Sequence, residues 1–143
     1  MGKTRKRFVI ALIVFVAALL LAQLFQVEKT NPPVRADNSL DPVVKPLLKK
    51  ACYDCHSNET VWPWYSKVAP VSWLLADDVR GGRGHLNFSE WGNYAGDERS
   101  RKLKDIEEEI RLGEMPPWYY SLMHRDSRLS PSERDQIAAW TKK

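Results

Sequence analysis

Both cysteines of this 143-residue chain lie in the stretch ACYDCHSNE, residues 51–59, and a histidine directly follows the second one. Cys52 and Cys55 are three positions apart, so on a helix they lie on one face. Two thiols in this arrangement can form thioethers with neighbouring vinyl groups on one edge of a porphyrin, and the imidazole of His56 can bind the iron. The C-x-x-C-H spacing therefore predicts covalent attachment of one c-type haem, with His56 as an axial ligand.

Three other interpretations of these residues are weaker. A structural disulfide between Cys52 and Cys55 leaves His56 without a role. A thioredoxin-like redox pair expects an alternating strand–helix–strand pattern, and the sequence has none around this motif. A zinc site needs two more ligands, and His85 and His124 lack the close spacing of a zinc finger. Haem attachment is the interpretation that gives all three residues of the motif a role.

The opposite side of the iron needs a sixth ligand, and the sequence offers several donors. Met115 stands in GEMPPW, directly before two prolines that fix the backbone and remove two N–H donors. Such a stiff loop can hold a thioether against the iron, and methionine opposite histidine raises the reduction potential, as suits an electron carrier. Met115 is therefore the predicted sixth ligand, with His124 as the main alternative. Ligation by Met123 or His85, an open sixth position, and simple core packing of Met115 stay open.

An uncharged apolar run at residues 8–25 follows the basic cluster KTRKR. A run of this length is typical of a transmembrane helix, and the basic residues indicate a cytoplasmic N-terminus. A cleaved signal peptide is the alternative interpretation. We expect a single-pass protein of the bacterial cytoplasmic membrane, with its C-terminal domain in the periplasm or outside. Its parts are a basic tip at 1–7, an anchor at 8–26, a linker at 27–38 and a haem-binding domain at 39–143.

The distribution of charge argues against a nucleic-acid partner. The chain carries 22 Lys and Arg residues against 18 Asp and Glu residues, and four of the basic ones lie in the predicted tip. The remainder is formally neutral, so it lacks the clustered positive charge that neutralises phosphates.

The pattern of residues 39–143 is helical, without a convincing alternating strand. We expect about four helices, which begin at Asp41 or Pro46, at Pro70, in DERSRKLKDIEEEIRLG and in SPSERDQIAAW; the second ends at Gly81-Gly82. Long connections in so small a domain need something to wrap around. The predicted fold is therefore all-α, a small cytochrome c-like domain around a covalent haem, preceded by one N-terminal transmembrane helix.

Two of these helices carry clear local signals. The third has an apolar stripe that includes Ile106 and Ile110, and Gly113 suits the left-handed position that ends a helix. In the fourth, Ser130 and Glu133 are spaced for a capping box.

Two further groups are candidates for the surroundings of the haem. Aromatic side chains of VWPWYSKVAPVSW can line the pocket or pack in an ordinary core, and basic side chains of VRGGRGH can pair with propionates. The first group is Trp62, Trp64, Tyr65 and Trp73, and the second is Arg80, Arg83 and His85.

The chain resembles the bacterial haem-binding domain family of monohaem c-type cytochromes. The resemblance covers about residues 40–141 and includes the blocks CYDCHSNETVWPWY, NFSEW and GEMPPWYY. It implies covalent haem at Cys52 and Cys55, with His56 as the proximal ligand. The order of haem motif, MPP loop and closing helix is also similar to that of small class I cytochromes c, which supports Met115.

These features predict a monohaem c-type cytochrome that carries single electrons and meets redox proteins transiently, while its N-terminal helix binds the membrane. A haem-based sensor or ligand-binding module is the alternative, and it requires an open or displaceable sixth position. We do not expect an enzyme, because a peroxidase-like activity needs an open iron face and a distal acid–base group, for which His124 is the one plausible candidate.

Overall fold

The computed structural model describes residues 2–143 and is helical, with no β-strand in that range. Met1, the first residue of the predicted basic tip, lies outside the described residues. The chain divides into two compact units, one of Met1–Lys29 with Trp62–Asp78 and the other of Thr30–Val61 with Val79–Lys143. The all-α part of the fold prediction is confirmed.

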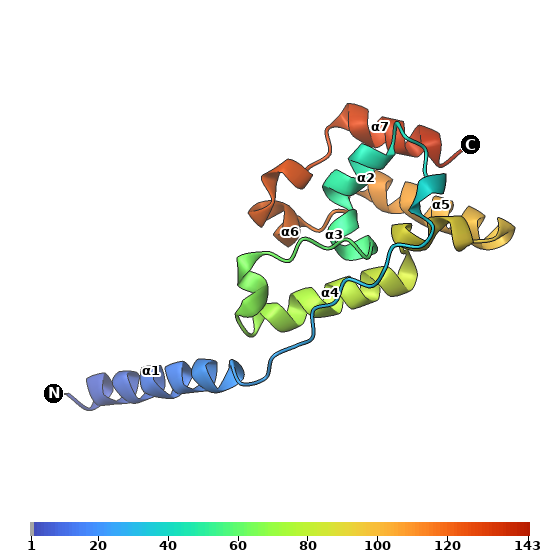
Figure 1. Ribbon diagram of the computed structural model, residues 1–143. Coiled ribbons are helices and arrows are strands. Elements are labelled where there is room, and N and C mark those ends of the chain that lie inside the picture. Colours follow the sequence, from blue (N-terminus) through green and yellow to red (C-terminus); the bar gives the residue numbers. More distant parts are fainter. Residues whose placement is uncertain (1) are drawn as a thin grey trace. The chain divides into compact units, whose positions relative to one another are not determined.

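The α-helices are labelled in Figure 1, and short 3-10 turns (η) lie between them. The α-helices are α1 (Lys3–Ala22), α2 (Lys45–Ala51), α3 (Tyr53–His56), α4 (Val71–His85), α5 (Gly96–Leu112), α6 (Trp118–Met123) and α7 (Pro131–Trp140). The 3-10 turns are η1 (Asp37–Ser39), η2 (Trp64–Lys67), η3 (Phe88–Asn93) and η4 (Arg125–Ser127).

The prediction of an N-terminal transmembrane helix is wrong. No helix within residues 2–143 combines the length and the apolar composition that a membrane span requires. Helix α1 begins at Lys3, so its first turns are basic, and its apolar part from Phe8 to Ala22 is only about 22 Å long, shorter than a hydrocarbon core of about 30 Å. The predicted single-pass location in the bacterial cytoplasmic membrane is wrong for the same reason. The signal-peptide interpretation stays a prediction.

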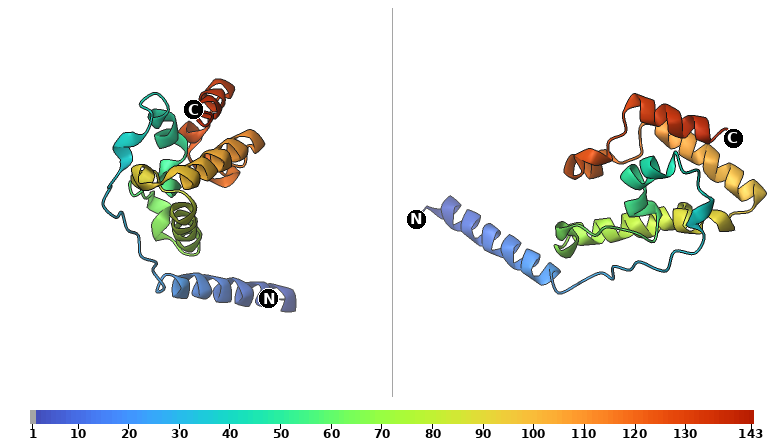
Figure 2. Two further views of the ribbon diagram at one scale, coloured as in Figure 1. Left: turned by 90° about the vertical axis from the view of Figure 1, so that its right-hand side faces the viewer. Right: turned by 45° about the horizontal axis from the view of Figure 1, so that its top comes forward.

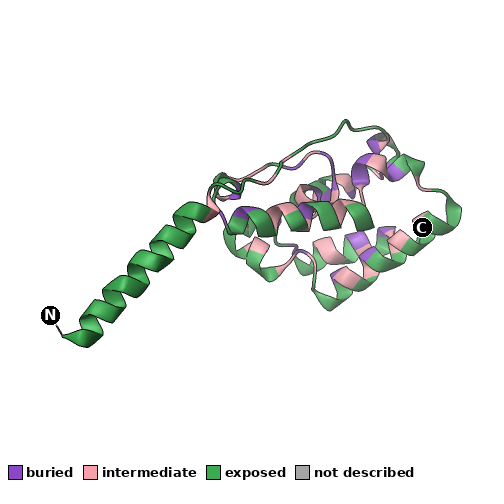
Figure 3. Cartoon of the chain, turned by 90° about the horizontal axis from the view of Figure 1, so that it is seen from below, coloured by how far each residue is buried: buried purple, intermediate pink, exposed green. Residues whose placement is uncertain are grey.

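The smaller unit contains α1, η2 and the first half of α4. None of the residues of α1 is buried, and nearly the whole helix has the colour of exposed residues in Figure 3. The residues that follow α1 are held by polar contacts. The side-chain amide of Gln23 bonds both backbone groups of Ala69, at 3.0 Å each, and the Trp73 indole donates to the carbonyl of Phe25 at 2.7 Å.

The larger unit contains the haem motif and one hydrophobic core. Helices α5 and α7 pack against each other, as Figures 1 and 2 show, and α2 packs against α3. The core consists of Leu40, Val44, Leu48, Ala51, Tyr53, Phe88, Trp91, Ile106, Ile110, Leu129, Ile137 and Trp140. Tyr53 comes from inside the C-x-x-C-H motif, so the motif is built directly onto this core.

The two helices with clear local signals are confirmed. Helix α5 buries Ile106 and Ile110 and ends at Gly113, whose φ of 74° lies in the left-handed region. Helix α7 begins with the predicted capping box, in which the Ser130 side chain accepts from the Glu133 N–H while the Glu133 carboxylate accepts from the Ser130 N–H. Both signals depend on residues within one turn, so the sequence alone shows them.

Helix α4 does not end at Gly81-Gly82 as predicted, but continues to His85. Glycine weakens a helix interior by about 1 kcal/mol relative to alanine, so the stretch RGGRG is a poor helix by propensity. Tertiary contact compensates, because the backbone of Gly82 lies against α3, as described below. The carbonyls of Gly82 and of Leu86, on either side of the extra turn, lie beside the C-x-x-C-H motif.

Candidate haem site

Cys52 joins two helices. It is the C-cap residue of α2 and the N-cap residue of α3. Its non-helical backbone conformation (φ −123°, ψ −32°) separates the two helices. The N–H groups of Cys55 and His56 both bond the Cys52 carbonyl, at 3.2 and 2.9 Å, so one turn of helix places the three motif residues together. Both cysteines are half-buried, and no disulfide joins their sulfurs.

Tyr53 fixes the turn to the core. Its ring stacks on Phe88 with 5.3 Å between centroids and 8° between planes, and its hydroxyl donates to Asp37 at 3.1 Å. A stacked aromatic pair adds about 1 kcal/mol beyond its burial. Since Tyr53 lies between the cysteines, its anchoring holds the turn that carries both thiols and His56 against the core, and Cys52 itself packs against that core.

His56 is held in one orientation by the C-terminal end of helix α4 and by Leu86, the residue that follows it. Its Nδ1 lies 3.0 Å from the carbonyl oxygen of Gly82 and 3.1 Å from that of Leu86. Carbonyl oxygens only accept, so Nδ1 carries the proton and Nε2 keeps its lone pair. Histidine ligands of metals are usually oriented in this way by a backbone carbonyl or a carboxylate.

Burial lowers the pKa of His56, although its bonds to Leu86 and Gly82 act in the opposite direction. The neutral imidazole is the form that binds metal, because a proton and a metal ion compete for Nε2. A lowered pKa keeps this nitrogen available over a wider range of pH. Orientation and protonation therefore both favour His56 as an iron ligand.

Gly82 has no room for a side chain. A Cβ atom built there would lie 2.5 Å from the carbonyl oxygen of Cys55 and 3.2 Å from its Cβ. This close approach brings the Gly82 carbonyl within hydrogen-bonding distance of His56. The glycine is therefore required by packing between α3 and α4.

The alternatives for the cysteine pair gain no support. Burial, and to a smaller extent the neighbouring Cys55, raises the pKa of the Cys52 thiol to about 12, whereas thioredoxin-like pairs need a lowered thiol pKa. Among residues 2–143, no three or more His, Cys, Asp or Glu side chains are grouped closely enough to hold a metal ion. A tetrahedral zinc site therefore lacks ligands in this part of the chain.

Met115 lies half-buried in the connection between α5 and α6, followed by the buried Pro116. Its segment is linked to the motif by a contact that the sequence did not reveal. The Tyr120 hydroxyl of α6 donates to Oδ2 of Asp54, a residue between the two cysteines. The other carboxylate oxygen of Asp54 accepts from the Val61 N–H at 2.9 Å. The sequence alone does not show this role of Asp54, because its partner Tyr120 lies 66 positions away.

The other candidate ligands are His124, Met123 and His85. The ring of His124 stacks on that of Tyr120, with 4.3 Å between centroids and 8° between planes. Met123 is 58% exposed at the end of α6. His85 is exposed at the end of α4. Met115 and His124, which are both half-buried, stay predictions as sixth ligand.

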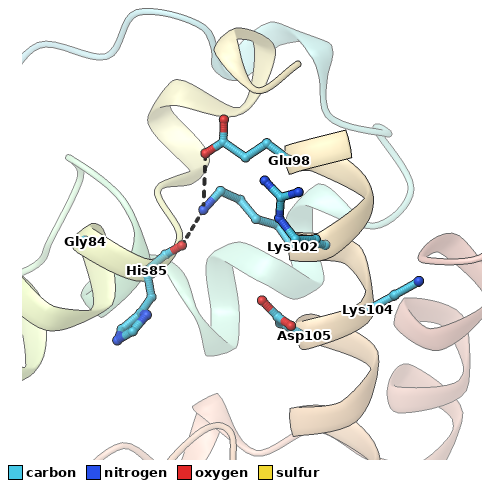
Figure 4. Close-up of a pocket in the computed structure, with 7 residues that line it drawn as sticks. Gly84, His85, Glu98, Lys102, Lys104 and Asp105 are labelled. Carbon is cyan, nitrogen blue, oxygen red and sulfur yellow. Dashed lines mark hydrogen bonds and ion pairs between the residues drawn. The ribbon is translucent and has the colours of Figure 1, made fainter. Parts of the chain in front are cut away.

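His85 borders a polar hollow of about 390 Å³, shown in Figure 4. The hollow is lined by Gly84, His85, Glu98, Arg101, Lys102, Lys104 and Asp105. Lys102 crosses it to bond the His85 carbonyl at 2.6 Å and to pair with Glu98 at 3.6 Å. Its mixed charge and polar walls do not suit an apolar porphyrin.

Arg83, a predicted propionate partner, already has partners within the larger unit. Its guanidinium donates to the carbonyls of Ser57 and Thr30 at 2.7 and 2.9 Å and to the side chains of Asn31 and Thr60 at 3.0 and 2.8 Å. Arg83 therefore joins the segment at Thr30 and Asn31 to the segment that follows His56. The predicted aromatic lining belongs to the smaller unit, where Trp64 is 74% exposed, and it stays a prediction.

The donor set and its surroundings fit a haem. Two thiols and an oriented imidazole follow one another on α3, and the nearby α6 has an apolar face with no buried residue. That face consists of Trp118, Tyr119, Leu122 and Met123, which lie between 38% and 78% exposed. The fold and the site together define a helical haem-binding protein.

The family model of the haem-binding domain matches residues 17–143. The chain belongs to the haem-binding domain family. No curated protein and no solved structure matches it.

Proposed function

We propose that this protein is a monohaem c-type cytochrome that transfers single electrons. The observation that carries the proposal is the orientation of His56, whose Nδ1 is bonded to the carbonyls of Gly82 and Leu86 so that Nε2 is available next to two half-buried cysteines. When bound, the haem supplies an iron that alternates between the ferrous and ferric states. The protein's task is then to attach, orient and shield the group rather than to perform chemistry on a substrate.

Each residue of the site has a defined role in this proposal. Cys52 and Cys55 would attach the porphyrin through thioethers, and His56 would provide the fifth ligand. Met115 would provide the sixth through its thioether sulfur, in a loop stiffened by Pro116 and Pro117. Methionine opposite histidine favours the reduced iron and leaves no open position, which suits electron transfer through transient contacts with redox proteins.

A carrier is favoured over an enzyme by the position of His124. A peroxidase-like reaction needs an open iron face and a distal acid–base group. The imidazole of His124 instead lies flat against the ring of Tyr120, with 4.3 Å between centroids and 8° between planes. This stacking favours a packing role for His124.

Replacing Met115 with alanine tests the proposed sixth ligand. We expect Met115→Ala to abolish the methionine-to-ferric-iron charge-transfer band and to make the reduced protein bind carbon monoxide, because the sixth position opens. Absorption spectra of the oxidised protein, and of the reduced protein with and without carbon monoxide, measure both effects.

Met123→Ala is the matched control for this variant, since it removes a thioether that is 58% exposed, and it should leave both spectra unchanged. A charge-transfer band that survives in Met115→Ala would show that another donor holds the iron. Ready formation of a carbon monoxide adduct by the unmodified protein would instead favour a sensor or ligand-binding module.

A further inference from the structure

Helix α6 lacks the apolar anchoring that positions the other helices of the larger unit. It is six residues long, none of them is buried, and Trp118, Leu122 and Met123 are each more than half exposed. So short a helix is unstable in isolation and needs tertiary contacts to persist. The contacts that hold α6 therefore also determine where the adjacent Met115 loop lies.

The polar contact to α3 involves the opposite side of α6. Tyr120 and His124 are four positions apart and share one helix face, whereas Trp118 and Leu122 lie on another. From the first face, the Tyr120 hydroxyl donates to the carboxylate of Asp54. The ring of His124 stacks on one face of the Tyr120 ring, with 4.3 Å between their centroids.

Asp54 is itself firmly held. It lies between Cys52 and Cys55, and its second oxygen accepts the Val61 N–H at 2.9 Å, while its carbonyl accepts the Thr60 hydroxyl at 2.8 Å. The carboxylate is thus a fixed point of the haem-attachment turn rather than a mobile surface group.

We propose that Asp54 and Tyr120 are a pair of positioning residues that ties the Met115 loop to the haem-attachment turn and so keeps the thioether on the iron. The inference rests on the proposed function, in which Met115 is the sixth ligand. Between Met115 and α6 stand only Pro116 and Pro117, whose fixed φ angles transmit the position of the helix to the methionine.

The test measures how easily an external ligand displaces the methionine. Imidazole is titrated into the oxidised, haem-loaded full chain and followed by absorption. We expect Tyr120→Phe to increase the apparent affinity for imidazole about tenfold, the factor expected for loss of one hydrogen bond to a charged group. Replacing Asp54 by alanine should have a similar effect. Asp54→Asn should retain the unmodified affinity, since an amide can accept from Val61 and donate to Tyr120.

Tyr94→Phe separates positioning from general loss of stability. The Tyr94 hydroxyl accepts the Asn87 N–H at 2.8 Å elsewhere in the larger unit, so this variant also loses a tyrosine hydrogen bond. It should bind imidazole as the unmodified protein does. If Tyr120→Phe also binds imidazole with unchanged affinity, or if Tyr94→Phe shows the same increase, the inference is wrong.

Two further outcomes are decisive. Should Tyr120→Phe fail to accumulate with haem, the comparison of Asp54→Asn with Asp54→Ala decides, and equal affinities for imidazole would overturn the pairing. Failure of the proposed function is distinguishable, because the unmodified protein would then lack the methionine charge-transfer band before any variant is compared.

Discussion

Replacing His56 with alanine is expected to convert the iron from a low-spin to a high-spin state almost completely. The variant loses the imidazole that the carbonyls of Gly82 and Leu86 orient, and no other histidine lies within the attachment turn. Added imidazole should restore the low-spin spectrum, because it can occupy the space left by the side chain. Absorption spectra of the haem-loaded variant, or of the chain reconstituted with haem, measure the change.

His85→Ala is the control for this variant. It removes an exposed imidazole from the end of α4, beside the polar hollow, and should leave the spectrum unchanged. A low-spin spectrum in His56→Ala without added imidazole would contradict the assignment of the fifth ligand. A change of spin state in His85→Ala would indicate that His85, rather than His56, is the fifth ligand of the iron.

Replacing Gly82 with alanine is expected to destabilise the protein by about 1–3 kcal/mol, the range for overpacking a tight contact. The added Cβ would lie 2.5 Å from a backbone oxygen, which cannot move aside as the end of a flexible side chain can. Helix α4 must therefore shift away from α3, and the bond from His56 to the Gly82 carbonyl weakens. Urea denaturation measures the free energy of unfolding, and the absorption spectrum reports on the haem environment.

Gly81→Ala is the matched control, since it adds the same methyl group one position earlier in the same helix, where no atom lies within 4 Å of the added Cβ. We expect this variant to be neutral or more stable by up to about 1 kcal/mol, because alanine is the better helix former. Equal stability of the two variants would refute the close approach of α4 to the haem motif.

The features that the sequence predicted well depend on neighbours within one turn. The capping box of α7 and the glycine end of α5 are local signals, and both are confirmed. The C-x-x-C-H motif is also a local signal, since its three residues lie within one turn, and its chemistry stays a prediction. The family membership supports haem binding, while the roles of the individual residues stay predictions.

The features that the sequence missed depend on contacts between distant segments. The continuation of α4 through Gly81 and Gly82 is favoured by packing of Gly82 against Cys55. Helix propensities describe single residues and do not include such a contact. The bond between Tyr120 and Asp54 joins residues 66 positions apart. The predicted membrane anchor was wrong for a different reason, because hydropathy gave the length of the apolar run but not where helix α1 begins and ends.

The mass of the intact chain, produced in a host with a functioning cytochrome c maturation system, tests the proposed attachment most directly. The account predicts the mass of the polypeptide plus one haem, retained under denaturing conditions because two thioethers are covalent. The double variant Cys52→Ala/Cys55→Ala should show the polypeptide mass alone. If the unmodified protein also shows only the polypeptide mass, the assignment of Cys52 and Cys55 as haem attachment residues is contradicted.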